Sequence, residues 1–299
     1  MSQTYVVGDV HGDYTRLVGL LKQARLVDER LRWLGGDSAL WFMGDFFDRG
    51  EDGVAAVDLV MRLQREAAAA GGRVGALLGN HEPLILSALW MPDEQTSGLA
   101  GTFYGDWKLN GGTDSDLQRL TAAHTEWIVG LPSLAREGDW LLMHADSTDY
   151  IRYGRSIEEV NLALRALLLR RDPAEYNRLF GEFGREFGDH RPDGHRKVDL
   201  VLHTFGAARL VHGHTLISNM TRRPLQSVTE ALVYDGGRCV DVDGGLGEGG
   251  QGFVYRLHST PPTVSSAPRE PLNLPTLDLG PWTEGLSLRR EDMYGDDER

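Results

Sequence analysis

The amino-acid sequence predicts an α/β fold, with a parallel sheet early in the chain and antiparallel strands late in it. Short apolar runs recur and end at glycine, which is typical of buried strands that stop at loops. Within residues 1–90 these runs alternate with helical patterns, and such alternation favours parallel pairing. After residue 228 the strand-like runs follow one another closely, which favours antiparallel pairing.

The predicted elements are placed by their local patterns. Leu17, Leu20, Leu21 and Ala24 share one face of a first helix. A second helix is expected over 52–70, where apolar residues have helical spacing and two glycines follow. Further helices are expected over 82–89, where a proline occupies the first turn, over 114–129 and over 157–170. Strands are expected at 5–7, 39–43, 74–78, 140–143, 208–211, 228–234, 238–243 and 252–257.

The domain organisation is expected to be simple. Residues 1–258 form one domain, and a helical insertion at about 150–197 interrupts its rhythm. Six prolines fall within residues 261–281, and the final residues are highly charged. We therefore expect residues 259–299 to form a Pro-rich, charged tail that is extended or disordered.

Composition limits the partners of this chain. Of its 299 residues 41% are hydrophobic, and the formal net charge is −13. The charge argues against a nucleic-acid polymer as partner, since that needs a basic surface, but a phosphorylated substrate stays compatible because bound cations reverse the local sign. No run reaches the ~18 apolar residues of a membrane span, and the N-terminus lacks a secretory pattern. We expect a cytoplasmic protein with no membrane partner, and the oligomeric state stays open.

Five of the apolar runs end in clusters of metal-seeking side chains, which is the main functional signal. The clusters are GDVHG (8–12), GDFFDRG (44–50), GNHE (79–82), HAD (144–146) and HGHT (212–215). In open α/β sheets, ligands bind at the carboxyl ends of the strands. The repetition of this arrangement predicts a single site to which all five clusters contribute.

The residue types in these clusters suit a two-metal hydrolase. Asp9 and His11 alternate with Val10, so both point the same way in extended geometry. A carboxylate with an imidazole suits Mn, Fe or Zn better than Mg or Ca. Asp45 can bridge two ions through its two oxygens. Ions about 3.5–4 Å apart could activate a bridging water and neutralise charge in phosphoryl transfer.

The neighbouring side chains could complete the chemistry. Asn80, His144 and His214 offer neutral donors to the second ion. Arg49 can clamp phosphate oxygens with its planar fork. His81 could protonate the leaving oxygen, with Asp48 orienting its ring.

The set GDVHG, GDFFDRG and GNHE resembles the signature of the phosphoprotein phosphatase (PPP-type) family of metallophosphoesterases. Its bacterial and phage branch is the most similar, together with the related symmetrical dinucleoside-tetraphosphatases. The resemblance extends from Tyr5 to about Leu257. It implies a calcineurin-like fold with a central β-sandwich of mixed sheets flanked by helices. It also implies two divalent ions, most often Mn, and hydrolysis of phosphate monoesters as in Ser/Thr protein phosphatases.

The same resemblance assigns roles residue by residue. Asp9, His11 and Asp45 would bind the first metal, and Asp45, Asn80, His144 and His214 the second. Arg49, Asn80 and His81 would contact the substrate, and His81 with Asp48 would form the proton-donating pair.

Several alternatives stay open. Residues 127–132 resemble those of the dinucleoside-polyphosphate hydrolases, so the substrate could be a dinucleoside polyphosphate or another small nucleotide. The chain could also be a metal-binding interaction module without catalytic activity. Arg152 or Arg155 could supply a second phosphate-binding arginine, and His212 could support the site or coordinate. Residues 245–250 fit GxGxxG but lead into a strand, so we expect a hairpin loop near the rim of the site.

Overall fold

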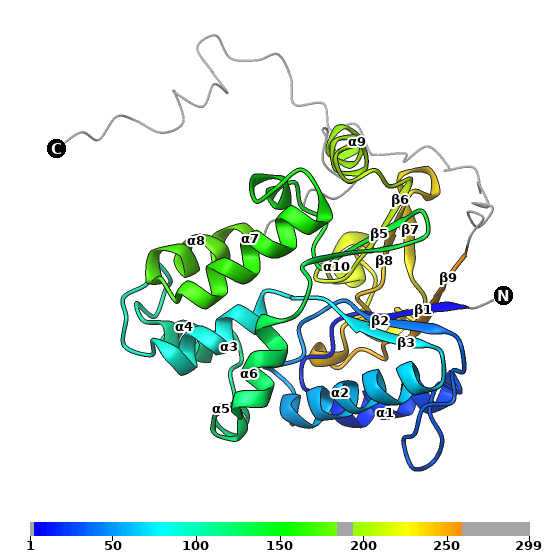
Figure 1. The fold of residues 1–299 in the computed structure, drawn as a ribbon, viewed down its shortest axis with the longest axis horizontal. Coiled ribbons are helices and arrows are strands. Elements are labelled where there is room, and N and C mark those ends of the chain that lie inside the picture. Colours follow the sequence, from blue (N-terminus) through cyan, green and yellow to red (C-terminus); the bar gives the residue numbers. More distant parts are fainter. Residues whose placement is uncertain (1–2, 184–193, 259–299) are drawn as a thin grey trace, which may run out of the picture. The chain divides into compact units, whose positions relative to one another are not determined.

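The computed structural model describes residues 3–183 and 194–258, and within them two mixed sheets carry the fold (Figure 1). The four-stranded sheet contains, in spatial order, β3 (Arg73–Ala76), β2 (Ala39–Phe42), β1 (Thr4–Val7) and β9 (Val254–Leu257). The five-stranded sheet contains β4 (Leu134–Glu137), β5 (Trp140–Met143), β6 (Arg209–His212), β8 (Cys239–Asp241) and β7 (Leu232–Tyr234). The predicted mixed α/β fold is confirmed.

Both sheets contain three parallel strands, to which the first sheet adds one antiparallel edge strand and the second adds two. In the first sheet β1, β2 and β3 are parallel, while β9 is antiparallel to β1. In the second sheet β5, β6 and β8 are parallel, while β4 and β7 pair antiparallel with β5 and β8. Each sheet therefore directs the carboxyl ends of its central strands to one edge, where ligands collect in α/β folds.

The two sheets share a buried cluster of apolar side chains. Val6 and Trp41 of the first sheet belong to the same cluster as Leu142, Val211 and Val240 of the second. Four of these five side chains are fully buried, and each such side chain contributes about 1.5–3 kcal/mol. This cluster is the core of a β-sandwich.

Helices connect the strands and cover the sheets. In chain order they are α1 (Tyr14–Gln23), α2 (Gly53–Ala69), α3 (His81–Trp90), α4 (Phe103–Leu109), α5 (Asp114–Arg119), α6 (Ala122–Val129), α7 (Ile157–Arg170), α8 (Pro173–Phe183), α9 (Gly194–Phe205) and α10 (Ile217–Thr221). Short 3₁₀ turns are η1 (Asp149–Arg152), η2 (Leu225–Ser227), η3 (Asp235–Gly237) and η4 (Leu246–Glu248). Among the described residues, none of these helices combines the length and apolarity needed to cross a bilayer.

Helix α2 shows how local chemistry fixes an element. The Asp52 carboxylate accepts a hydrogen bond from the Ala55 backbone N–H at 2.8 Å. The buried Asp116 carboxylate accepts from the N–H groups of Gly53 and Val54 at 3.0 and 3.2 Å. Three of the first N–H groups, which a helix leaves unpaired, are thus satisfied.

Some sequence expectations were wrong in detail. The single helix expected over 114–129 is two helices, α5 and α6, because Leu120 is extended and Thr121 forms a capping box with His124 that starts the second. Helices α4, α8, α9 and α10 and strand β4 were not predicted. In the polar stretch after Asp172, Tyr176 and Leu179 are fully buried, so α8 is stabilised by tertiary packing rather than by an evident apolar stripe.

The late strands also differ from expectation. Strands β7 and β8 pair antiparallel as predicted, but β8 also pairs parallel with β6 and β9 belongs to the other sheet. Residues 245–250 therefore cross between sheets and do not form the expected hairpin. The insertion at about 150–197 contains η1, α7, α8 and the start of α9. The predicted tail, 259–299, lies outside the described residues, and the domain boundaries stay a prediction.

Candidate metal centre

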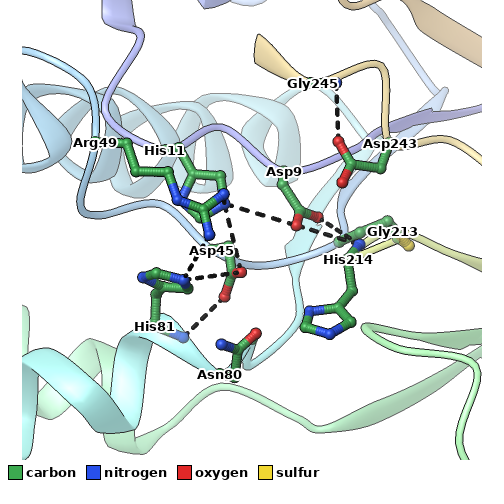
Figure 2. Close-up of polar contacts among 12 residues, drawn as sticks. Asp9, His11, Asp45, Arg49, Asn80, His81, Gly213, His214, Asp243 and Gly245 are labelled. Carbon is green, nitrogen blue, oxygen red and sulfur yellow. Dashed lines mark hydrogen bonds and ion pairs between the residues drawn. The ribbon is translucent and has the colours of Figure 1, made fainter. Parts of the chain in front are cut away.

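The ends of five parallel strands bring the predicted site residues together (Figure 2). Asp9 follows β1, Asp45 follows β2 and Asn80 follows β3, while His144 and His214 follow β5 and β6. The side chains of Asp9, Asp45 and His144 are buried. Residues that are far apart in the sequence therefore surround one small volume.

Asp45 lies at the centre of this arrangement. Its Oδ2 atom is 3.4 Å from His144 Nε2, 3.6 Å from His11 Nε2 and 3.9 Å from His81 Nε2. Ligand atoms of Asp9, Asp45, His144 and His214 lie within 4.8 Å of one another, and so do those of His11, Asp45 and His81. Asp45 belongs to both groups, which is the position that a bridging carboxylate requires.

Backbone carbonyls orient two of the candidate imidazole ligands. His11 Nδ1 lies 3.0 Å from the Phe47 carbonyl oxygen, and His144 Nδ1 lies 2.8 Å from that of Met43. A carbonyl oxygen only accepts, so each Nδ1 carries a proton, and each Nε2 is the atom left to bind metal once it is unprotonated. This is the usual second contact of a metal-binding histidine.

The remaining donors are held by direct contacts. Asn80 Oδ1 lies 2.9 Å from His144 Nε2. The His214 backbone N–H donates to both oxygens of Asp9, at 3.1 and 3.2 Å. These contacts orient an amide oxygen and a carboxylate toward the same volume.

The backbone of the site adopts left-handed conformations that side-chain-bearing residues rarely use. Of the ten non-glycine residues with positive φ in the described part of the chain, half belong to the predicted site. They are His11, Asp45, Asp48, Arg49 and His214. Such conformations cost about 1–3 kcal/mol each and cluster at functional sites.

Glu82, to which sequence analysis gave no role, fastens two motif loops. One carboxylate oxygen accepts from the backbone N–H groups of Gly79 and Asp45 at 2.8 and 2.9 Å, and the other from Phe46 at 2.7 Å. Glu82 is fully buried. The acid of GNHE therefore ties its own loop to GDFFDRG, which explains why the two motifs lie together.

Burial and mutual proximity perturb the carboxylates of the site. Burial and the neighbouring Asp243 carboxylate raise the pKa of Asp9 well above its ordinary value. Burial also raises the pKa of Asp45, but His144 and His81 outweigh it, so the pKa of Asp45 is well below its usual range. Asp243 follows β8 and accepts from the Gly245 N–H at 2.9 Å. A further acid after a strand was the sequence signal that could have identified it.

The donor set fits divalent cations. Three buried carboxylates, those of Asp9, Asp45 and Asp243, meet here, and the one arginine near them in the described part of the chain, Arg49, is itself partly accessible to solvent. Buried charges require partners or bound metals. Mixed carboxylate, amide and imidazole donors suit Mn, Fe or Zn.

His81 and Asp48 form a buried pair beside these donors. His81 Nδ1 lies 2.6 Å from Asp48 Oδ2, and both side chains are almost completely inaccessible. The Trp107 indole N–H donates to the other oxygen, Asp48 Oδ1, at 2.7 Å. Burial lowers the pKa of His81, but Asp45 and Asp48 outweigh this and raise it. His81 Nε2 faces the volume between Asp45 and Arg49 (Figure 2).

Arg49 reaches into the same volume and stays partly accessible. Its Nη1 atom lies 3.0 Å from His11 Nε2 and 3.2 Å from Glu248 Oε1. Glu248 lies in η4, within the glycine-rich residues 245–250, so this segment does border the site as predicted. A half-accessible guanidinium here can clamp an anion that enters from solvent.

The residues with undecided roles are placed as follows. Both nitrogens of buried His212 have contacts, with the Gly213 carbonyl and the Tyr234 hydroxyl at 2.8 Å each. Arg152 lies in η1, 3.7 Å from Asp149. The Arg155 backbone N–H donates to Glu159. The second phosphate-binding arginine stays a prediction.

A pocket of about 460 Å³ opens beside Asn80. Its lining includes Leu84, Leu99 and Leu109, together with Asn110 and Asn177. Asn110 and Asn177 already donate to the backbone carbonyls of Asp106 and Gln95. The pocket therefore offers both apolar surface and polar groups, the Asp106 carboxylate among them, beside the candidate metal centre.

A family model described as calcineurin-like phosphoesterase matches residues 3–218. The chain is 39% identical over 80 residues to Shewanella-like protein phosphatase 1 of Plasmodium berghei, covering 27% of this chain and 22% of that protein. It is 34% identical over 84 residues to a symmetrical bis(5'-nucleosyl)-tetraphosphatase of Enterobacter sp., covering 28% and 25%. These alignments span only about a quarter of the relatives' length.

A solved structure shares most of the fold. The cold-active protein tyrosine phosphatase of a psychrophilic Shewanella species superimposes with a TM-score of 0.62 at 22% identity. The superposition covers 87% of this chain and 76% of that one. At this identity the likeness shows the fold alone.

Proposed function

Because the chain belongs to the calcineurin-like phosphoesterase family, we propose that it is a two-metal phosphomonoesterase that acts on phosphorylated protein. One observation carries the proposal. The metal-donor groups around Asp45, the His81–Asp48 pair and the Arg49 guanidinium all border one volume. Metallophosphoesterase chemistry requires these three functions in that proximity.

Two divalent cations bound there would supply an activated water and neutralise charge on the phosphoryl group. Asp9, His11 and Asp45 would hold one, and Asp45, Asn80, His144 and His214 the other. We propose manganese, since the mixed nitrogen and oxygen donors include no thiolate.

The chain's own side chains would bind the phosphate and move the proton. Arg49 would hold two phosphate oxygens with its fork. His81 would carry a proton on Nε2, which faces the site, while Asp48 keeps the Nδ1 proton in place. Transfer from Nε2 to the leaving oxygen would release the alcohol or phenol.

The pocket beside Asn80 favours a peptide over a nucleotide. Its lining contains leucine and amide side chains but neither lysine nor arginine. A dinucleoside polyphosphate carries further phosphates that need counter-charges, and the acidic Glu248 beside Arg49 opposes them. A phosphorylated residue within a peptide brings a single anionic group to Arg49.

The test is a phosphate-release panel with added Mn. We expect turnover of phosphoserine and phosphothreonine peptides and of p-nitrophenyl phosphate, lost in Asp9→Asn and His81→Ala. His203→Ala, at an exposed position of α9, is the matched control and keeps full activity. Preferential hydrolysis of diadenosine tetraphosphate would instead assign a dinucleoside polyphosphate as the substrate in place of phosphorylated protein. Full metal loading without any turnover would indicate a metal-binding interaction module.

A further inference from the structure

Helix α4 and the turn after it form hydrogen bonds with the GDFFDRG loop, although neither belongs to any of the five motifs. The Trp107 indole N–H donates to Asp48 Oδ1 at 2.7 Å. The Gly111 carbonyl oxygen accepts from the Arg49 backbone N–H at 2.8 Å. Two successive residues of the loop, each with φ of 70°, are thus held by one neighbouring segment.

The two oxygens of Asp48 have separate partners. Oδ1 accepts from Trp107, while Oδ2 lies 2.6 Å from His81 Nδ1. Asp48 and Trp107 are fully buried, so water does not compete for either oxygen. Two fixed contacts determine the plane of the carboxylate, and that plane determines the direction of the His81 ring.

The indole itself is tightly enclosed. A side-chain carbon added at Gly112 would lie 2.3 Å from the Trp107 ring, so the backbone passes directly against it. The Tyr104 ring packs at a centroid distance of 5.5 Å, and Lys108 Nζ lies 5.4 Å from the indole centroid. Lys108 also donates to the Gly112 carbonyl at 2.9 Å. Trp107 is therefore a rigid support rather than a mobile contact.

We propose that Trp107 is a positioning residue, whose indole N–H holds Asp48 so that His81 delivers its proton to the leaving group. This inference rests on the proposed phosphoesterase function. Trp107 does not touch the substrate and acts only through Asp48 and His81. Without the indole N–H, the buried Asp48 Oδ1 loses its hydrogen-bond donor. The contact between Oδ2 and His81 then remains as the one that orients the carboxylate.

The experiment compares leaving groups in Trp107→Phe. A positioned general acid matters where the leaving oxygen is strongly basic and matters little where the leaving group departs unprotonated. We expect kcat for phenyl phosphate to fall about 10-fold, as for loss of a hydrogen bond to a charged group. With 2,4-dinitrophenyl phosphate we expect a change of less than about twofold, because no proton is required. KM and bound Mn stay as in the wild type.

Two further variants make the test decisive. Trp33→Phe removes another mostly buried indole N–H, which donates to the Gly36 carbonyl and not to a residue of the GDFFDRG loop, and it leaves both rates unchanged. In an Asp48→Asn background, Trp107→Phe adds no further loss, because both changes act through one group. If Trp107→Phe does not fold, 3-benzothienylalanine at position 107 keeps the ring and replaces only the N–H.

The outcomes separate the two hypotheses. An inactive wild-type protein with bound metal contradicts the proposed function. An active wild type in which Trp107→Phe slows both substrates equally, or slows neither, overturns the positioning role alone.

Discussion

Gly79 lies against Asp45 so closely that any side chain at this position must displace the carboxylate. A Cβ atom on Gly79 would lie 2.1 Å from Asp45 Oδ1 and 2.5 Å from Asp45 N. Ordinary contact begins at 3.4 Å, so Oδ1 would have to move by about 1.3 Å, the difference between these distances. Rotation of the Asp45 side chain would relieve only the first of these contacts, because the second is between the added Cβ atom and the Asp45 backbone nitrogen.

Gly79→Ala should therefore disrupt metal binding. Metal–ligand distances tolerate deviations of about 0.2 Å, much less than the required shift, and Asp45 belongs to both donor groups. Disturbing the support of ligands typically costs on the order of 10–100-fold in metal affinity or activity. We expect a loss of at least that size in Mn affinity, measured by calorimetric titration, with a parallel loss of phosphatase activity.

Gly19→Ala is the matched control. Gly19 lies exposed in α1, and a Cβ atom there meets nothing within 4 Å. This variant should bind Mn like the wild type and unfold with about 0.5–1 kcal/mol more free energy, because alanine favours the helix. If Gly79→Ala bound Mn with wild-type affinity and stoichiometry, the placement of Asp45 between the two donor groups would be refuted.

Three further predictions concern the metals and the fold. Removing metal with a chelator should abolish activity and lower the midpoint of thermal unfolding, with both restored by Mn, because cations bind the folded state. Burial lowers the pKa of His144, but Asp45 and Asp9 raise it to about 10. His144 must lose this proton to bind metal, so Mn affinity should fall as the pH falls, and calorimetry in buffers of different ionisation enthalpy should detect the released proton at pH 7. Asp116→Ala leaves two N–H groups at the start of α2 without their partner and should lower the free energy of unfolding in urea by about 1–3 kcal/mol.

Much of the site could be predicted from the sequence because its information is local. Apolar runs place the strands, and the polar residues that follow each run are necessarily at strand ends. Asp9, Asp45 and Asn80 could be assigned to one edge of a sheet because parallel strands align their carboxyl ends. The structure indeed brings these residues together.

Other features depended on packing between distant segments. The division of 114–129 into two helices follows from a capping box that competes with a continuous helical pattern. Strand β9 joins β1 rather than its neighbours in sequence, because pairing depends on which sheet edge is available, and periodicity does not specify that edge.

The sequence by itself determined which side chains could ligate metal, because residue type and position at a strand end are local properties. Only the tertiary structure decided what supports them. The hydrogen bond from Trp107 to Asp48 joins residues 59 positions apart, and Glu82 becomes a fastening for Asp45 only once two loops meet. Such contacts form where two separate segments pack together and exclude water from their polar atoms. A local sequence pattern does not specify which distant segments pack together.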